Sequence, residues 1–148
     1  LISVRVAGLE PTVEEAIAVA EEYVKAGCDY LQVSHGMTDL KECPPYKDSA
    51  VSTLASLGVY FHEHFKDRIP VSCVGGIFTP AQANHLLDSG YVDTIDVARA
   101  ILADPGFANA VLQNTRYIRC YKCSACQYGP MMKHHCPAAI MRSRLGSH

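Results

Sequence analysis

The chain has 148 residues, and 49% of them are hydrophobic, which is enough to bury the core of one domain. Its 13 basic and 15 acidic residues nearly balance, so the composition argues against nucleic acid or another polyanion as a partner. No apolar run approaches the roughly 20 residues of a membrane span, and none resembles a signal peptide, so we expect no membrane partner and a cytoplasmic location.

The two ends of the sequence predict a piece of a longer protein. Leu1 stands where an initiator methionine is expected, and the chain starts inside an apolar strand pattern at residues 2–6. Residues 146–148, Gly-Ser-His, resemble residues added during cloning rather than native sequence.

Strand patterns and helix patterns alternate four times along the chain. Short apolar runs predict strands over 2–7, 29–34, 70–75 and 93–98, and longer runs predict helices over 13–26, 50–66, 80–89 and 105–115. Thr12 suits the N-cap of the first helix, and Gly27 and Gly90 are placed to end the first and third. This alternation indicates an α/β fold of parallel βα units with right-handed crossovers.

The predicted strands have one apolar and one polar face. The apolar side chains, expected to face the helices, are Val4, Val6, Leu31, Val33, Ile95 and Val97. The polar ones are Arg5, Gln32, Ser34, Ser72, Thr94 and Asp96. An open doubly wound sheet is covered on both faces, so a polar face favours the inside of a barrel mouth beside a polar ligand. Four units are half of an eight-stranded barrel, so we predict a half (β/α)8 TIM barrel over 1–116 and a cysteine-rich segment over 117–145.

Two predicted strand ends carry residues suited to a phosphate: Val74-Gly75-Gly76-Ile77 and Val97-Ala98-Arg99, with helix openings expected at Thr79-Pro80 and Asp104-Pro105. Glycine lets the backbone approach a ligand closely, and N–H groups at a helix start favour an anion. In (β/α)8 barrels a phosphate commonly binds the loops after strands seven and eight. We therefore predict a phosphate-bearing cofactor here; the alternative is a pair of ordinary tight turns that bind nothing.

Four of the seven cysteines form the pattern Cys120-x2-Cys123-x2-Cys126-x9-Cys136, followed by proline. Thiolates at such spacing can converge on one iron–sulfur cluster. Zinc competes, because four cysteines are also its structural ligand set and His134 or His135 could replace one of them. Free thiols are the third possibility. The remaining cysteines, Cys28, Cys43 and Cys73, are expected to be packing residues.

Three histidines need an interpretation. His35 ends the second strand, where it would either line a substrate mouth or serve as a hydrogen-bonded structural residue. His62 and His64 lie on the second helix beside charged residues, so we expect both at the surface.

The Val74-Gly75-Gly76-Ile77 motif, together with Asp93 and the run from Val97 to Pro105 (VARAILADP), resembles the closing section of the old yellow enzyme family. The cysteine-rich tail resembles the branch that contains 2,4-dienoyl-CoA reductase and trimethylamine dehydrogenase. The resemblance covers about residues 2 to 142 and implies strands five to eight of the family barrel plus the segment that follows.

The resemblance implies an FMN-dependent NAD(P)H oxidoreductase, which moves a hydride from a nicotinamide onto flavin and then reduces an activated double bond or another acceptor. The FMN phosphate would be held by the backbone of Gly75, Gly76, Ala98 and Arg99, with the Arg99 side chain close by. Ala98 replaces the usual glycine of the family. Arg5 matches an arginine at the pyrimidine end of the flavin, where a guanidinium stabilises the anionic reduced ring.

In the same branch a similar cysteine quartet binds a 4Fe-4S cluster, although the last gap here is shorter. The family's proton donor and substrate-orienting groups come from the first four strands, so the catalytic residues are unknown and we expect this piece alone to be inactive. A half barrel has two open edges, which predicts a homodimer or higher oligomer.

Two other functions are possible. One is a non-catalytic zinc-binding module on a βα scaffold. The other is a different phosphate-binding barrel enzyme, such as a sugar-phosphate aldolase or isomerase. No lysine stands at a predicted strand end to form a Schiff base, which weakens the aldolase alternative.

Overall fold

The computed structural model describes residues 1–36, 42–123, 125–126 and 136–145. The chain divides into two compact units. The first comprises Leu1–Ile77 and Ala81–Asp96, and the second comprises Phe78–Pro80 and Val97–His148. In the described part of the chain, no helix is both long and apolar enough to cross a membrane.

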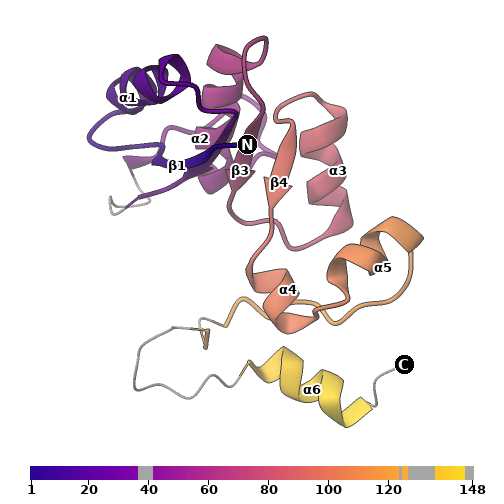
Figure 1. Ribbon diagram of the computed structural model, residues 1–148. Helices are drawn as coiled ribbons and strands as arrows, with labels where there is room; N and C mark the ends of the chain where they lie inside the picture. The colour runs from indigo at the N-terminus through magenta and orange to yellow at the C-terminus, as the bar shows by residue number, and fades with distance from the viewer. Residues whose placement is uncertain (37–41, 124, 127–135, 146–148) are drawn as a thin grey trace. The chain divides into compact units, whose positions relative to one another are not determined.

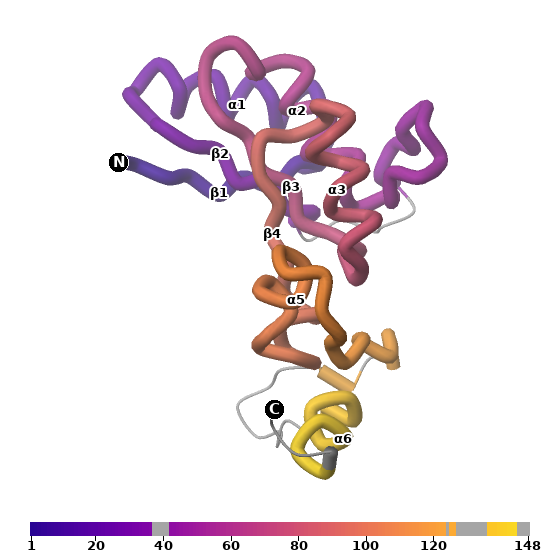
Figure 2. The backbone as a smooth tube through the Cα atoms, turned by 90° about the vertical axis from the view of Figure 1, so that its right-hand side faces the viewer, coloured from indigo at the N-terminus to yellow at the C-terminus, as the bar shows by residue number. Residues whose placement is uncertain are grey.

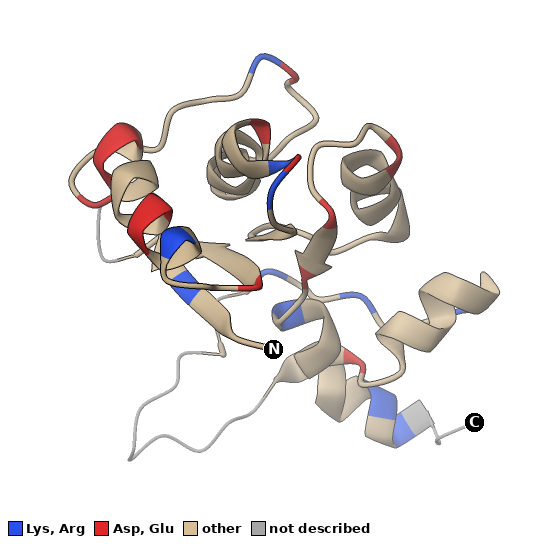
Figure 3. Ribbon diagram, turned by 45° about the horizontal axis from the view of Figure 1, so that its top comes forward, with Lys and Arg blue, Asp and Glu red and all other residues tan. Residues whose placement is uncertain are grey.

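The first unit is built on a parallel sheet of four strands: β1 (Ser3–Ala7), β2 (Tyr30–Ser34), β3 (Val71–Val74) and β4 (Thr94–Asp96). The strands are paired in chain order, β1-β2-β3-β4, and helices α1 (Val13–Lys25), α2 (Thr53–Phe65) and α3 (Pro80–Asp88) connect them (Figure 1, Figure 2). Because crossovers of one hand in this order place every helix on the same side, α1, α2 and α3 cover one face of the sheet (Figure 3). The predicted α/β fold of alternating units is confirmed.

The predicted helix ends are also confirmed. The Thr12 side chain caps α1 by accepting a hydrogen bond from the Glu15 amide at 3.2 Å. Gly27 follows α1 with a φ of 97° and Gly90 follows α3 with a φ of 64°, which is the left-handed geometry of a helix stop.

The core of this unit lies between the sheet and helices α1 and α2. Leu31 and Val33 of β2 are 0% and 1% exposed and point into it. Phe61 and Phe65 of α2, both fully buried, pack in the same cluster. The alternation of apolar side chains along each strand therefore positions the helix layer, as the sequence pattern predicts.

The opposite face of the sheet carries the predicted row of polar side chains. Arg5 pairs with Gln32, Gln32 with Ser72, and Ser72 with Thr94. The Ser72 hydroxyl donates a hydrogen bond of 2.6 Å to the Asp96 carboxylate on β4. Since residues at one register level of a sheet share a face, these side chains line the face opposite the helices.

Helix α2 packs tightly against the sheet at Gly58. A Cβ atom added there would lie 2.1 Å from Cβ of Cys73 on β3 and 2.8 Å from its Cα. Alanine is normally the better helix former, by about 1 kcal/mol. At this position we expect alanine to be destabilising instead. Gly58→Ala should lower the free energy of unfolding by about 1–3 kcal/mol, because the overlap forces α2 away from the sheet. Urea denaturation checks this; a more stable variant would contradict the packing described.

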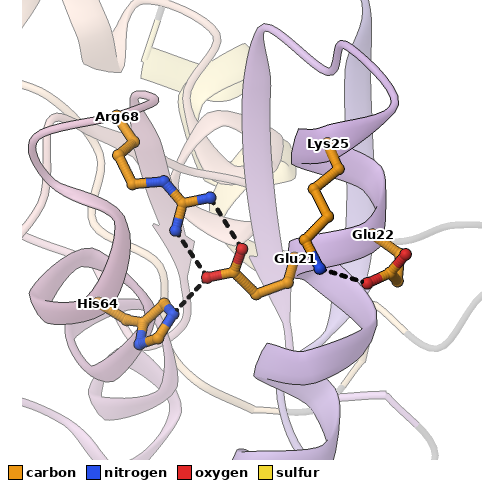
Figure 4. A network of polar contacts seen from close by, with 5 residues as sticks. All are labelled: Glu21, Glu22, Lys25, His64 and Arg68. Atoms are coloured by element: carbon orange, nitrogen blue, oxygen red, sulfur yellow. Dashed lines mark hydrogen bonds and ion pairs between the residues drawn. The ribbon is translucent and has the colours of Figure 1, made fainter.

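A carboxylate on α1 ties that helix to the end of α2 (Figure 4). Glu21 accepts two hydrogen bonds from the Arg68 guanidinium, at 2.6 and 2.8 Å, and lies 2.6 Å from Nε2 of His64. These contacts lower the pKa of Glu21 from 4.5 to about 2, and the hydrogen bonds from Arg68 contribute most.

This lowered pKa predicts an acid-dependent loss of stability. A depressed carboxyl pKa stabilises the fold above the unfolded value of 4.5, and that contribution disappears as the pH falls toward about 2. Glu21→Gln should therefore lose less stability than the wild-type protein between pH 4.5 and pH 2. Denaturation across this range measures the difference. Glu22→Gln, whose carboxylate contacts Lys25 of the same helix, is the matched control and should follow the wild type.

The described residues of the second unit form three helices: α4 (Arg99–Ala103), α5 (Phe107–Gln113) and α6 (Pro137–Leu145). The strand predicted over 93–98 was too long, since β4 ends at Asp96 and α4 begins at Arg99. Val97 therefore lies beyond the strand. The helix predicted over 105–115 exists as α5, but α4 before it was not expected. The Asp104 carboxylate, which accepts from the amides of Gly106 at 2.9 Å and Ile118 at 2.8 Å, fixes the turn between α4 and α5.

Candidate functional site

The predicted phosphate turn in the first unit has a backbone that requires glycine. Gly75 and Gly76 directly follow β3 with φ values of 134° and 69°. A Cβ on Gly75 would lie 2.1 Å from Cβ of Leu54, and one on Gly76 would lie 3.0 Å from Oγ of Ser52. The Ser52 hydroxyl donates to the Gly75 carbonyl at 2.9 Å and accepts from the Ala55 amide. The turn, which we call the Gly75–Gly76 ledge, thus needs glycine because it packs directly against the first turn of α2.

The other predicted phosphate residues, Ala98 and Arg99, belong to the second unit. Ala98 is the N-cap of α4, and its φ of −107° is an ordinary value for alanine, so the glycine usual in the family is not needed here. The Arg99 guanidinium lies over the ring of Phe78, 4.7 Å from the ring centre. The two glycines belong to the first unit and Ala98 and Arg99 to the second. Binding of one phosphate by both pairs of residues stays a prediction.

Arg5, the predicted flavin contact, is an exposed residue near the middle of β1. Its place in the polar row beside Gln32 fits a side chain that meets a ligand across the sheet face. Its contact with flavin is not tested by this geometry and stays a prediction.

All four cysteines of the predicted quartet line a single pocket in the second unit, together with Arg99 and Lys122. No three of the described cysteine, histidine, aspartate and glutamate side chains converge closely enough to hold an ion together. Four thiols are a donor set that zinc and iron–sulfur clusters both accept. The four cysteines share a pocket without converging on one point, so ligation by the quartet stays a prediction. His134 and His135, the alternative zinc ligands, lie outside the described residues.

The turn between the first two cysteines of the quartet has a geometry suited to holding a thiolate. Lys122 has a φ of 55°, which is uncommon for a residue other than glycine. This conformation directs the Lys122 amide to Sγ of Cys120 at 3.4 Å. Backbone N–H groups that donate to sulfur are a common supporting contact around metal-bound thiolates. Such local strain is concentrated at functional sites, which makes this turn the best-supported part of the candidate metal centre.

The other cysteines are packing residues, as predicted. Cys43 and Cys73 are 4% and 0% exposed, and Cys28 packs against the core. Burial raises the pKa of the Cys73 thiol to about 12, and the nearby Asp96 charge adds to the shift. Cys73 is therefore a neutral thiol at ordinary pH and no candidate ligand.

One histidine prediction was wrong. His62 is 8% exposed, and its Nε2 lies 3.4 Å from the Asp93 carboxylate, which also accepts a hydrogen bond from the Val71 amide. The prediction relied on the charged residues beside His62 in the sequence. It was wrong because buried residues lie on more than one side of α2. His64 is more exposed, at 43% of its side chain, and bonds to Glu21.

His35 follows β2, and its Nε2 is buried without a hydrogen-bond partner in the described structure. This does not fit a hydrogen-bonded structural histidine, and a place for His35 at a substrate mouth stays a prediction.

Two residues of the site were not found from the sequence. Phe78 supplies a ring that both Arg99 and Lys122 cover, each at 4.7 Å from its centre. No role was predicted for Lys122 from the sequence. The position of Lys122 inside a Cys-x2-Cys turn was the one available signal, since such turns contribute backbone N–H groups to sulfur.

Neither protein-family models nor curated proteins give a match to this chain. The class that the fold and site define is an α/β chain with a four-stranded parallel sheet, a glycine turn at one strand end and a pocket of four cysteines.

Proposed function

We propose that this chain is the FMN-binding half of an NAD(P)H oxidoreductase of the old yellow enzyme type, corresponding to strands five to eight of a (β/α)8 barrel. The observation that carries the proposal is the Gly75–Gly76 ledge at the end of β3, on a sheet whose other face is polar. Ligands of barrel enzymes bind at the carboxyl ends of the strands, where such a turn lies.

In this proposal the residues bind different parts of FMN. Gly75 and Gly76 present backbone without side chains to the phosphate, and Ala98 and Arg99 approach it from the start of α4. Arg5 stabilises negative charge at the pyrimidine end of the ring. Bound FMN would supply the chemistry of accepting reducing equivalents from NAD(P)H and passing them to an acceptor.

The four cysteines would hold a 4Fe-4S centre that exchanges electrons with the flavin. Support comes from the shared pocket and from the N–H bond to Cys120. The same two observations favour one second candidate, a structural zinc module, because zinc takes the same four thiolates.

Purification without oxygen, followed by incubation with FMN and removal of the unbound flavin, tests the two candidates. The oxidoreductase proposal predicts flavin absorption bands and about four iron atoms with acid-labile sulfide per chain. About one zinc per chain without flavin supports the structural module. Protein that retains neither flavin nor metal contradicts both.

We also propose that a second copy of the chain completes the sheet. Edge strand β1 carries Arg5 and edge strand β4 carries Asp96 on the same polar face, so edge-to-edge pairing brings opposite charges together. A twofold pair would close eight strands and remove both open edges. Light scattering should give twice the 16.1 kDa chain mass, or a higher multiple, and Arg5→Glu should shift the protein toward monomer. A wild-type monomer at all concentrations contradicts this.

A further inference from the structure

We propose that Lys122 and Arg99, held on the ring of Phe78, form a cationic clamp that neutralises the thiolate centre and determines how tightly it keeps its metal. The inference rests on the proposed thiolate centre. It assigns a role there to Lys122 and Phe78, which belong to neither its ligand set nor the flavin site, and a second role to the side chain of Arg99. All three side chains belong to the second unit, so the clamp is a property of that unit alone.

Contacts with Phe78 place the two cations beside the cysteines. The Phe78 side chain is buried, at 8% exposure, and the Lys122 ammonium and the Arg99 guanidinium each lie 4.7 Å from its ring centre. Such stacking holds a flexible cationic side chain in place while its charged group keeps most of its contact with water. Both cationic residues also line the pocket that contains the four cysteines. The ring therefore holds two positive charges at the position where thiolate charge would gather.

The charges of the centre require such compensation. Four thiolates around a divalent ion, or around an oxidised 4Fe-4S core, leave a net charge of about −2. No acidic side chain is among the described residues that line the pocket, whereas Arg99 and Lys122 supply two positive charges. The described lining of the pocket therefore carries a net positive charge, which would offset the negative charge of a thiolate centre.

Lys122 acts through its backbone as well as its side chain. Its left-handed φ of 55° aims its amide at Sγ of Cys120, while its ammonium covers Phe78. One residue therefore provides both a hydrogen bond to a ligand sulfur and a compensating charge. A lysine strained into this conformation costs about 1–2 kcal/mol more than glycine would, which indicates that the side chain has a use.

A competition assay on the full chain with Zn²⁺ as the probe tests the clamp. The protein is loaded with Zn²⁺ without oxygen, and release to a coloured chelator gives the zinc affinity of each variant. Lys122→Gly keeps the amide and removes the side chain. Relief of the backbone strain can only favour this turn, so a loss of affinity would report the loss of the side chain and its ammonium. We expect it to weaken zinc binding about 10- to 100-fold, the range found when groups around metal ligands are removed.

Further variants separate charge from structure. Lys122→Arg should keep the wild-type affinity, Lys122→Glu should lose more than Lys122→Gly, and Phe78→Leu should lose about three- to tenfold. High salt should shrink the loss in Lys122→Gly, because screening replaces the clamp. Lys25→Ala, on α1 of the first unit, is the control and should bind zinc as the wild type does.

The outcomes distinguish the inference from the proposed centre. Wild-type protein that binds no zinc shows that the thiolate centre does not form, whatever Lys122 does. Wild-type protein that binds zinc while Lys122→Gly and Lys122→Glu bind it equally well overturns the clamp and leaves the centre standing. Equal melting temperatures of the zinc-free variants exclude misfolding as the cause of a loss.

Discussion

Gly75→Ala is expected to lower the free energy of unfolding by about 3 kcal/mol or more and to abolish FMN binding. A φ of 134° lies in a region that residues with a Cβ avoid, and the added atom would lie 2.1 Å from Cβ of Leu54. Backbone strain of this kind costs about 1–3 kcal/mol, and the steric overlap adds a similar amount. Urea denaturation measures the stability, and quenching of flavin fluorescence measures the binding.

Two further glycines serve as controls for this prediction. Gly27→Ala keeps a positive φ of 97° but meets no atom within 4 Å, so it should cost only about 1–2 kcal/mol and leave FMN binding intact. Gly76→Ala meets only the side chain of Ser52, Oγ at 3.0 Å and Cβ at 3.1 Å, and should remain folded while it binds FMN more weakly. Equal effects at Gly75 and Gly27 would show that the turn has no special constraint.

Cys123→Ser is expected to weaken metal binding more than about 100-fold. Loss of a ligand exceeds the cost of losing a supporting group, and thiolate ligands supply most of the binding free energy of such centres. Iron, zinc and sulfide analysis of anaerobically purified protein measures the change. The exposed Cys123 can be replaced with little effect on packing, so a fall in content reports ligation rather than folding.

Cys28→Ser is the matched control for the cysteine prediction. Its thiol is half-buried and donates toward the Tyr30 carbonyl at 3.1 Å, far along the chain from the quartet. The variant should keep the metal content of the wild-type protein. The same loss in both variants would mean that the metal binds thiols without preference, and the quartet would no longer be a site.

The order of elements was predictable because each unit repeats one local pattern. Alternating residues such as Leu31 and Val33 identify a strand with one buried face, and Thr12 and Gly27 mark the ends of α1 by their own chemistry. Helix α4 was missed because it has only 5 residues and because Val97 continues the alternation of Ile95 and Asp96 in β4. Strand and helix patterns are indistinguishable over such a short apolar run.

The residues of the candidate site were likewise predictable only in part. Glycines and cysteines were found because their chemistry is visible in single residues and short spacings. The clamp on Phe78 was not found, since it depends on Lys122 and Arg99 meeting one ring from positions far apart in sequence. The burial of His62 was likewise invisible, because it follows from what packs on α2 rather than from its charged neighbours.

The central claim is that two strand ends grip the phosphate of FMN, and riboflavin is the direct probe because it is the same flavin without that phosphate. Titration of the chain with each flavin, followed by fluorescence, should show FMN binding at least about tenfold more tightly, with inorganic phosphate competing. Gly76→Ala should reduce this ratio. Equal affinity for FMN and riboflavin, or no effect of phosphate, would contradict the account.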